Sequence, residues 1–235
     1  MYLQGNAGSP LHRLPVFSTL LTSRPSLHPL PSSTRVVAVG PRSYWKSPGR
    51  ATEHGITTDY RATLDHITRQ WPRSPVILYG HSLGGAAAVC LLARLKTQEY
   101  PNVSGLVLEN PFASIPAMVK ALYPSPWTPY HHLGNFAFDK WDAVAAMRES
   151  HEDSVLQSVM RDVLVLVSEH DEVVPRQMGE SLYELSQRGR GMDGIGRLAV
   201  IDGALHENAW TKREWLREVR RYVNAIVESK SARCQ

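Results

Sequence analysis

The chain has 235 residues, of which 43% are hydrophobic and 20% charged, and its formal net charge is +4. This length suits one large domain or two small ones, and the composition excludes a wholly disordered chain. The basic side chains are scattered apart from Lys212 to Arg221 and the tail, which is weak ground for a nucleic-acid partner. The longest apolar runs reach only about ten residues, where a bilayer span needs roughly 20. We therefore expect no nucleic-acid partner and no membrane anchor in this chain.

The chain begins abruptly for a protein with alternating strands and helices. Met1 to Gln4 is typical of the end of a strand, and it continues directly into the glycine-containing stretch Gly5 to Gly8. Because nothing precedes this strand end, we expect an amino-terminal portion to be missing. On this view the protein is cytoplasmic if the chain is complete and membrane-associated if an upstream anchor belongs to it, and peripheral membrane contact is compatible with either.

Five short β-branched runs are bounded by turn residues and separated by helical patterns. Such runs are typical of strands that are buried on both faces of a parallel sheet. The runs are Arg35–Val39, Val76–Tyr79, Gly105–Leu108, Val163–Val167 and Leu198–Ile201. Together with the strand end at the start of the chain, they predict a single α/β domain over residues 1–235. Its sheet is expected to be doubly wound and mainly parallel, with about six strands.

Helical periodicity fills the intervals between these runs. Apolar side chains recur at helical spacing from Ile56 to Ile67, and Thr57 or Thr58 is the expected cap. Two further helices are predicted over Ala86–Leu95 and Trp215–Ile226.

Two segments break the alternation. Ser23 to Ser33 is rich in Pro and Ser and is typical of a surface connection. From about residue 112 to 153, prolines alternate with aromatic side chains that include Phe112, Tyr130 and Trp141. A long irregular insertion between two strands is usually a functional loop. We therefore expect a lid whose aromatic residues line an apolar substrate pocket, and a poorly ordered linker is the alternative.

The cysteines and glycines indicate no cofactor. Cys90 and Cys234 are too few for a disulfide framework or a CxxC metal site, and both are expected to be free thiols. The stretch from Gly5 to Gly8 has neither the GxGxxG spacing of a dinucleotide fold nor the GK[ST] ending of a P-loop. We therefore predict neither a nucleotide cofactor nor a metal.

The strongest chemical signal is the sequence Gly80-His-Ser-Leu-Gly84. It follows a predicted strand directly and precedes a helix of small residues. In a nucleophile elbow of this type, the serine hydroxyl projects from a tight strand-to-helix turn. Ser82 is therefore the predicted nucleophile, and the backbone N–H of Leu83 is a predicted donor to the oxyanion.

A serine nucleophile needs a base and an acid that orients the base. In this architecture the acid and then the histidine follow the serine, each on a loop after a later strand. Asp171 and His206 stand at such positions, after the predicted strands that end at Val167 and Ile201. Glu169 and Glu172 remain alternatives for the acid. The other nine histidines are less well placed, since they precede the elbow, lie within it or in the insertion, or adjoin the acid.

The glycine-containing stretch at the start of the chain is suited to a second oxyanion donor. A backbone N–H on a short loop after a strand can point at a developing negative charge. Asn6 is the predicted donor, although a Gly-rich turn after a strand more often serves only as a turn.

These residues resemble the α/β-hydrolase superfamily, and more narrowly its bud-emergence and abhydrolase-domain type of serine hydrolases. Three motifs of that group are matched by Gln4–Gly8, Leu108–Ile115 and Asp171–Pro175. The likeness runs from Gly5 to about Ile226. It implies an oxyanion loop after the group's third strand, and lysophospholipids, acylglycerols or S-acylated proteins as substrates.

The chain departs from the group's pattern in three places. Gln4 stands where the group has a histidine, and His206–Trp210 differs from the H-N-D-T-W form. The first two strands and the membrane anchor of the group have no counterpart. The leading hypothesis is hydrolysis of esters or thioesters of apolar acyl groups through an acyl-enzyme. A non-catalytic binding or scaffold protein, or an inactive fragment, is the alternative, and peptidase or carbon–carbon hydrolase chemistry is a third possibility.

Overall fold

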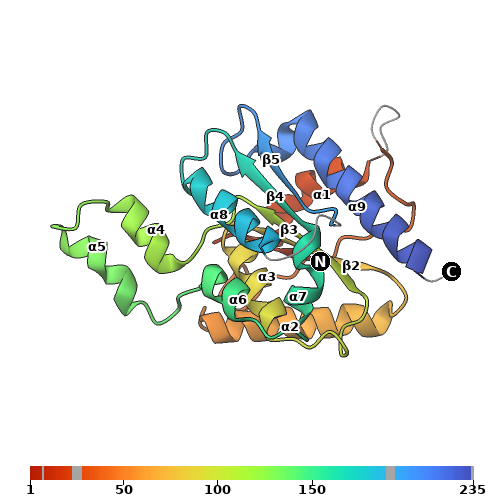
Figure 1. Cartoon of the computed structure of the whole chain (residues 1–235), viewed down its shortest axis with the longest axis horizontal. Helices are drawn as coiled ribbons and strands as arrows, with labels where there is room; N and C mark the ends of the chain where they lie inside the picture. Colours follow the sequence, from red (N-terminus) through yellow and green to blue (C-terminus); the bar gives the residue numbers. More distant parts are fainter. Residues whose placement is uncertain (7, 23–27, 189–193, 234–235) are drawn as a thin grey trace.

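The computed structural model describes residues 1–6, 8–22, 28–188 and 194–233 (Figure 1). Part of the predicted surface connection, residues 23–27, and the predicted free thiol of Cys234 lie outside the described residues. Cys90 is a buried free thiol, as the sequence predicts, and burial raises the pKa of this thiol to about 12.

A parallel sheet forms the centre of the protein. Its strands lie side by side in chain order. They are β1 (Tyr2–Leu3), β2 (Val76–His81), β3 (Val103–Glu109), β4 (Val163–Ser168) and β5 (Arg197–Ile201). Tyr79 pairs with Val107, and Val165 pairs with Leu108 on one side and Leu198 on the other. The predicted α/β sheet is therefore confirmed, and the carboxyl ends of its strands meet at one edge.

The predicted strand Arg35–Val39 is wrong, and the described sheet has five strands where about six are predicted. This run makes one isolated bridge, between Ala38 and Tyr2, with a hydrogen bond of 2.8 Å from Tyr2 N to Val37 O. β1 offers only two residues for pairing. Pro41 follows shortly after and has no N–H to donate, so the ladder does not extend.

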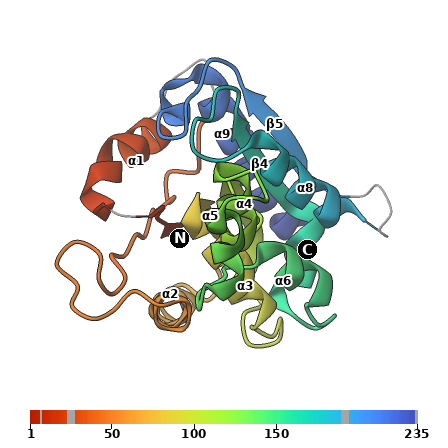
Figure 2. The same cartoon turned by 90° about the vertical axis from the view of Figure 1, so that its left-hand side faces the viewer.

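Helices cover both faces of the sheet (Figure 2). They are α1 (Leu14–Leu21), α2 (Glu53–Gln70), α3 (Leu83–Ala93), α6 (Ala143–Glu149), α7 (Val155–Val159), α8 (Arg176–Gln187) and α9 (Arg213–Arg233), with 3₁₀ turns at η1 (Pro10–Arg13), η3 (Met160–Asp162) and η4 (Ala209–Thr211). α1 and α9 pack on one face, and α2, α3, α6, α7 and α8 pack on the other. Side chains of β4 alternate between the two cores, which makes the fold doubly wound.

Two of the predicted helix boundaries shift. The Oγ1 of Thr52 accepts a hydrogen bond of 3.1 Å from Gly55 N and caps α2, so the prediction of Thr57 or Thr58 as the cap is wrong. A β-region residue whose side-chain oxygen reaches the third following N–H is the usual cap, whereas Thr57 lies inside the helix. α3 begins at Leu83, directly after Ser82, because Ser82 itself takes the capping position.

The insertion predicted over residues 112–153 folds into short helices. They are α4 (Ile115–Leu122), α5 (Pro129–Leu133), the 3₁₀ turn η2 (Gly134–Phe136) and α6. Pro116 and Pro129 stand in the first turns of α4 and α5, where a missing N–H costs no helical hydrogen bond. α4 and α5 form a hairpin that projects from the body of the protein (Figure 1). We call residues 115–138 the α4–α5 hairpin, and its role as a lid stays a prediction.

None of the described helices is both long enough and apolar enough to cross a membrane.

Candidate active site

Ser82 occupies a strained turn between β2 and α3. Its backbone has φ 51° and ψ −118°, a region that L residues rarely adopt. Hydrogen bonds of 2.9 Å hold the turn, from Ser82 N to Glu109 O and from Gly85 N to Ser82 O. A backbone of this kind costs about 1–3 kcal/mol and is found mainly at functional sites. The elbow predicted from the sequence is therefore formed.

Two glycines make this turn sterically possible. A Cβ on Gly80 would lie 2.4 Å from the carbonyl oxygen of Gly84, and a Cβ on Gly84 would lie 2.1 Å from the carbonyl oxygen of Leu3. Backbone atoms cannot yield to a side chain at these distances. β1, the elbow and the start of α3 therefore pack with their main chains in direct contact.

The structure pairs His206 with Asp171. Asp171 Oδ2 and Oδ1 lie 2.8 Å and 3.0 Å from His206 Nδ1, and both side chains are at least 95% buried. Asp171 Oδ1 also accepts bonds of 2.8 Å from Val173 N and Val174 N, which fix the carboxylate. A carboxylate at Nδ1 holds the imidazole with Nε2 available as a base.

The structure also distinguishes the three candidate acids. Glu172 Oε2 accepts a bond of 3.0 Å from the backbone N–H of His206, and Glu169 Oε2 accepts one of 2.7 Å from Gly203 N. Neither carboxylate contacts the imidazole, whereas Asp171 does. Glu169 and Glu172 therefore tie together the two loops that carry Asp171 and His206.

Asn110 completes the support of the His206 loop, although no role is predicted for it from the sequence. It is buried, and its amide donates bonds of 2.9 Å to His206 O and 3.0 Å to Ser168 Oγ and accepts one of 2.8 Å from Ser168 N. Its backbone has φ 46°, which Asn tolerates better than most residues. Its place directly after β3 could have indicated a role at the site, because the residues that follow parallel strands lie together at the carboxyl edge of the sheet.

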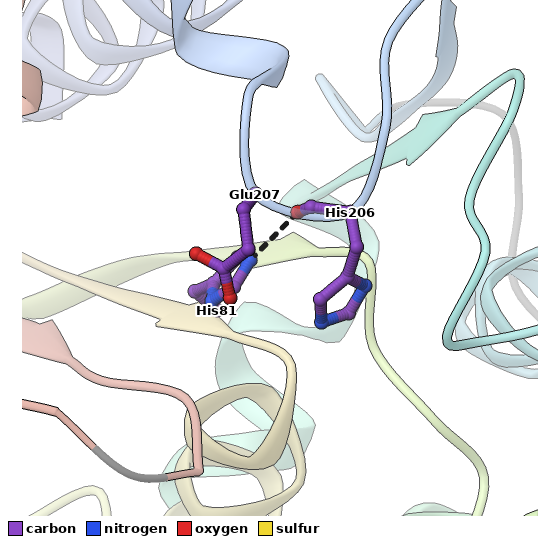
Figure 3. Close-up of side chains that lie close together, drawn as sticks. All are labelled: His81, His206 and Glu207. Atoms are coloured by element: carbon purple, nitrogen blue, oxygen red, sulfur yellow. Dashed lines mark hydrogen bonds between the residues drawn. The ribbon is translucent and has the colours of Figure 1, made fainter.

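His81, the variable residue of the elbow, bridges Ser82 to the His206 loop. Its Nε2 donates a bond of 3.0 Å to His206 O, and the two imidazole rings lie 5.0 Å apart (Figure 3). Arg13 Nη2 lies 3.4 Å from His81 Nδ1, so the neutral Nε2–H tautomer satisfies both contacts. No hydrogen bond joins Ser82 Oγ to His206 in the described residues. In free enzymes this contact is often loose, and here it stays a prediction.

The burial of His81 predicts an acid-sensitive fold. Burial lowers the pKa of His81 below 6.5. Below pH 6.5 the unfolded chain therefore binds a proton that the folded chain does not, so the free energy of unfolding falls as the pH falls. We expect His81→Gln, which keeps a donor for His206 O without ionising, to lose less of its free energy of unfolding than the parent between pH ~6.5 and ~5.5, by at most about 1 kcal/mol. Urea unfolding at both pH values measures this, and equal losses would contradict the neutral buried His81.

The predicted oxyanion donors lie beside Ser82. A Cβ on Gly5 would lie 3.4 Å from Ser82 Cβ, so the loop that contains Asn6 touches the nucleophile. Asn6 Oδ1 accepts a bond of 3.1 Å from the hydroxyl of Tyr44. Leu83 is the first residue of α3, where a backbone N–H has no partner within the helix. Assigning both N–H groups to an oxyanion hole stays a prediction.

A polar cavity of about 410 Å³ adjoins this loop. Gln4 to Asn6 line one side of it, and the ion-paired Arg13 and Glu207 line another. Burial raises the pKa of Glu207, but the neighbouring His81 and Arg13 outweigh it and lower that pKa overall. The cavity therefore presents both signs of charge beside the loop that contains Asn6.

His81, His206 and Glu207 lie close enough to hold a metal ion, with one ligand atom of each within 4.8 Å of the others (Figure 3). Their contacts oppose this use. The guanidinium of Arg13 pairs with Glu207, and its Nη2 lies 3.4 Å from His81 Nδ1. A cation there would meet an existing positive charge, so this cluster supports no metal site.

Of the three residues predicted to line the pocket, two lie in one core cluster and the third lies on the α4–α5 hairpin. Phe112 and Trp141 are each 4% exposed and lie in the core beneath α3 and α6. Tyr130 is 56% exposed and stacks on Tyr123 in the α4–α5 hairpin, with ring centroids 5.2 Å apart. None of the three lines the cavity beside the loop that contains Asn6. Aromatic composition predicted the insertion but could not separate core residues from exposed ones.

A family model described as serine aminopeptidase, S33, matches residues 42–159, half of the chain, and this match includes the elbow. The chain belongs to this α/β-hydrolase family. As a member, it shares its fold with an esterase of Pyrococcus furiosus, at TM-score 0.64 and 18% identity over 96% of this chain and 80% of the other. The abhydrolase-type resemblance and the predicted fold are thereby confirmed.

Two curated relatives are more similar to this chain in sequence than the esterase of Pyrococcus furiosus is. Lysophosphatidylserine lipase ABHD12 of Danio rerio is 31% identical over 198 residues, which are 83% of this chain and 48% of that protein. Protein bem46 of Schizosaccharomyces pombe is 29% identical over 177 residues, which are 74% of this chain and 52% of that protein. The chain spans about half the length of the curated relatives it matches.

Proposed function

We propose that the protein is a serine hydrolase that cleaves carboxylic ester or thioester bonds of apolar acyl substrates through an acyl-enzyme. The observation that carries the proposal is the strained elbow at Ser82 at the same sheet edge as the buried His206–Asp171 pair. A strained serine and an oriented imidazole at one edge are the parts of an acyl-transfer site. The similarity to a lysophosphatidylserine lipase supports ester lipids as the substrate class.

The first half of the reaction forms the acyl-enzyme. Ser82 Oγ attacks the acyl carbonyl carbon while its proton passes to His206 Nε2, and Asp171 stabilises the resulting imidazolium. The N–H groups of Leu83 and Asn6 bind the tetrahedral oxyanion, and each donor contributes on the order of 3 kcal/mol. The bond to the leaving alcohol or thiol then breaks, and His206 returns the proton to the leaving group.

The second half releases the acid. Water attacks the acyl carbon, His206 accepts the proton of the water, and the acyl bond to Ser82 breaks as that proton returns to Oγ. The strained backbone of Ser82 keeps the hydroxyl at the sheet edge throughout both halves, and the hydrogen bonds from His81 and Asn110 hold the His206 loop in place.

Turnover of p-nitrophenyl esters tests this proposal. We expect release of p-nitrophenol well above the buffer rate, faster for octanoate than for acetate because the acyl group is apolar. Amino-acid p-nitroanilides, which carry the free α-amino group that an aminopeptidase needs, are expected to react more slowly, and this comparison separates an esterase from the aminopeptidase activity that the family model is named for. A monodisperse sample that melts cooperatively and turns over none of these substrates would favour a non-catalytic scaffold.

A further inference from the structure

The exposed apolar surface of the protein is concentrated on the α4–α5 hairpin. Nine large apolar side chains are more than half exposed in the described part of the chain, and six of them lie in the short stretch of residues 122–138. The six are Leu122, Trp127, Tyr130, Leu133, Phe136 and Phe138. Trp127 is 94% exposed and Phe138 is fully exposed. An exposed cluster of this kind usually marks an interaction site.

The hairpin is held in shape by its own contacts. His131 Nδ1 bonds Tyr123 O at 2.7 Å, and His132 Nε2 bonds Pro126 O at 3.0 Å. Gly134 lies so close to α4 that a Cβ there would be 2.7 Å from Pro116 Cα. The apolar side chains therefore belong to a folded element, and this element extends away from the sheet (Figure 1).

The charge of the hairpin indicates what covers it. All 22 Asp and Glu residues of the chain lie outside residues 110–138, and Lys120 is the one Lys or Arg within that stretch. A carboxylate-free surface is compatible with the phosphate groups of a lipid surface, which repel acidic side chains. Trp and Tyr favour the boundary between headgroups and acyl chains, because their rings are apolar and their tips polar.

We propose that the α4–α5 hairpin docks on the surface of a lipid bilayer, with Trp127, Phe136 and Phe138 inserted among the headgroups. The inference does not depend on catalysis. α4 starts shortly after the end of β3, at the sheet edge that carries Ser82. Docking therefore turns the candidate active site toward the bilayer, so that acyl substrates reach it from there.

Co-sedimentation with vesicles tests the docking. The vesicles are phosphatidylcholine alone, or phosphatidylcholine with about one-fifth phosphatidylglycerol, and the protein carries Ser82→Ala so that no lipid is cleaved. We expect binding to both, and a loss of about tenfold or more in partitioning for the triple variant Trp127→Ala, Phe136→Ala, Phe138→Ala. Unchanged thermal melting of the triple variant excludes misfolding, since these side chains are exposed.

A pair of tryptophans gives the matched control. Trp45 is also exposed, at 58%, but lies outside the hairpin. Phosphatidylcholine brominated on its acyl chains quenches tryptophans that enter the bilayer. We expect Trp127→Phe to remove most of the quenching and Trp45→Phe to leave it.

Three results would overturn the docking: no binding to either vesicle, equal binding of the triple variant, or quenching that disappears with Trp45→Phe. Concentration-dependent dimerisation that the triple variant abolishes, without vesicle binding, would assign the hairpin to a second copy of the chain. The outcome is separable from the proposed function. Ester turnover without vesicle binding overturns only the docking, and binding without turnover overturns only the hydrolase.

Discussion

Replacing Ser82 with alanine is expected to lower kcat for p-nitrophenyl octanoate by about 10⁶-fold. The residual hydrolysis is expected to proceed without an acyl-enzyme. The hydroxyl is the proposed nucleophile, and no second hydroxyl in the elbow can replace it. Alanine removes one oxygen and keeps the Cβ, so the strained turn is retained and the melting temperature is expected to stay close to that of the parent. Initial rates at saturating ester measure the effect.

Ser43 offers a matched control for this variant. It is also a serine with positive φ, 68°, and it is exposed. Ser43→Ala is expected to turn over the ester at the parent rate. If both serine variants lost activity equally, or if Ser82→Ala retained it, Ser82 would not be the nucleophile.

The substitution Asp171→Asn is expected to cost about 10⁴-fold in kcat. The amide keeps the size of the carboxylate but no longer stabilises a positive charge on His206. It also presents a donor where Nδ1–H needs an acceptor, so the imidazole turns to the tautomer that cannot act as a base. Because Asp171 also accepts from Val173 N and Val174 N, circular dichroism must show that the loop is intact.

Glu169→Gln is the matched control on the same loop. Its carboxylate accepts from Gly203 N and makes no hydrogen bond to the imidazole of His206, so we expect less than about a fivefold change in kcat. A loss for Glu169→Gln as large as that for Asp171→Asn would mean that the loop, and not the carboxylate beside Nδ1, carries the effect.

Four of the strands and the elbow could be predicted from the sequence because both kinds of feature are local. A β-branched run followed by glycine, serine and small residues specifies a strand, a tight turn and a helix with no need of distant contacts. Asp171 follows one predicted strand and His206 follows the next, which predicts that both lie at the same edge of the sheet. Their pairing at Nδ1 needed the structure, since Glu169 and Glu172 have the same chemistry and lie within two residues.

Pairing and burial were harder to predict, because both depend on distant parts of the chain. Arg35–Val39 has the composition of a strand, but the two-residue β1 gives it one bridge. Phe112 and Trp141 look like pocket residues, yet helices packed around them place both in the core. Asn110 shows the same limit, since its side chain bonds to Ser168 and His206, which lie 58 and 96 residues away in the chain.

The most direct test of the central claim is to locate a covalent adduct. The folded protein is treated with a fluorophosphonate, digested, and its peptides are sequenced by mass spectrometry. We predict a single adduct on Ser82, formed in the parent and in Ser43→Ala and absent from Ser82→Ala. An adduct on any other residue, or none on a protein that melts cooperatively, would contradict the account.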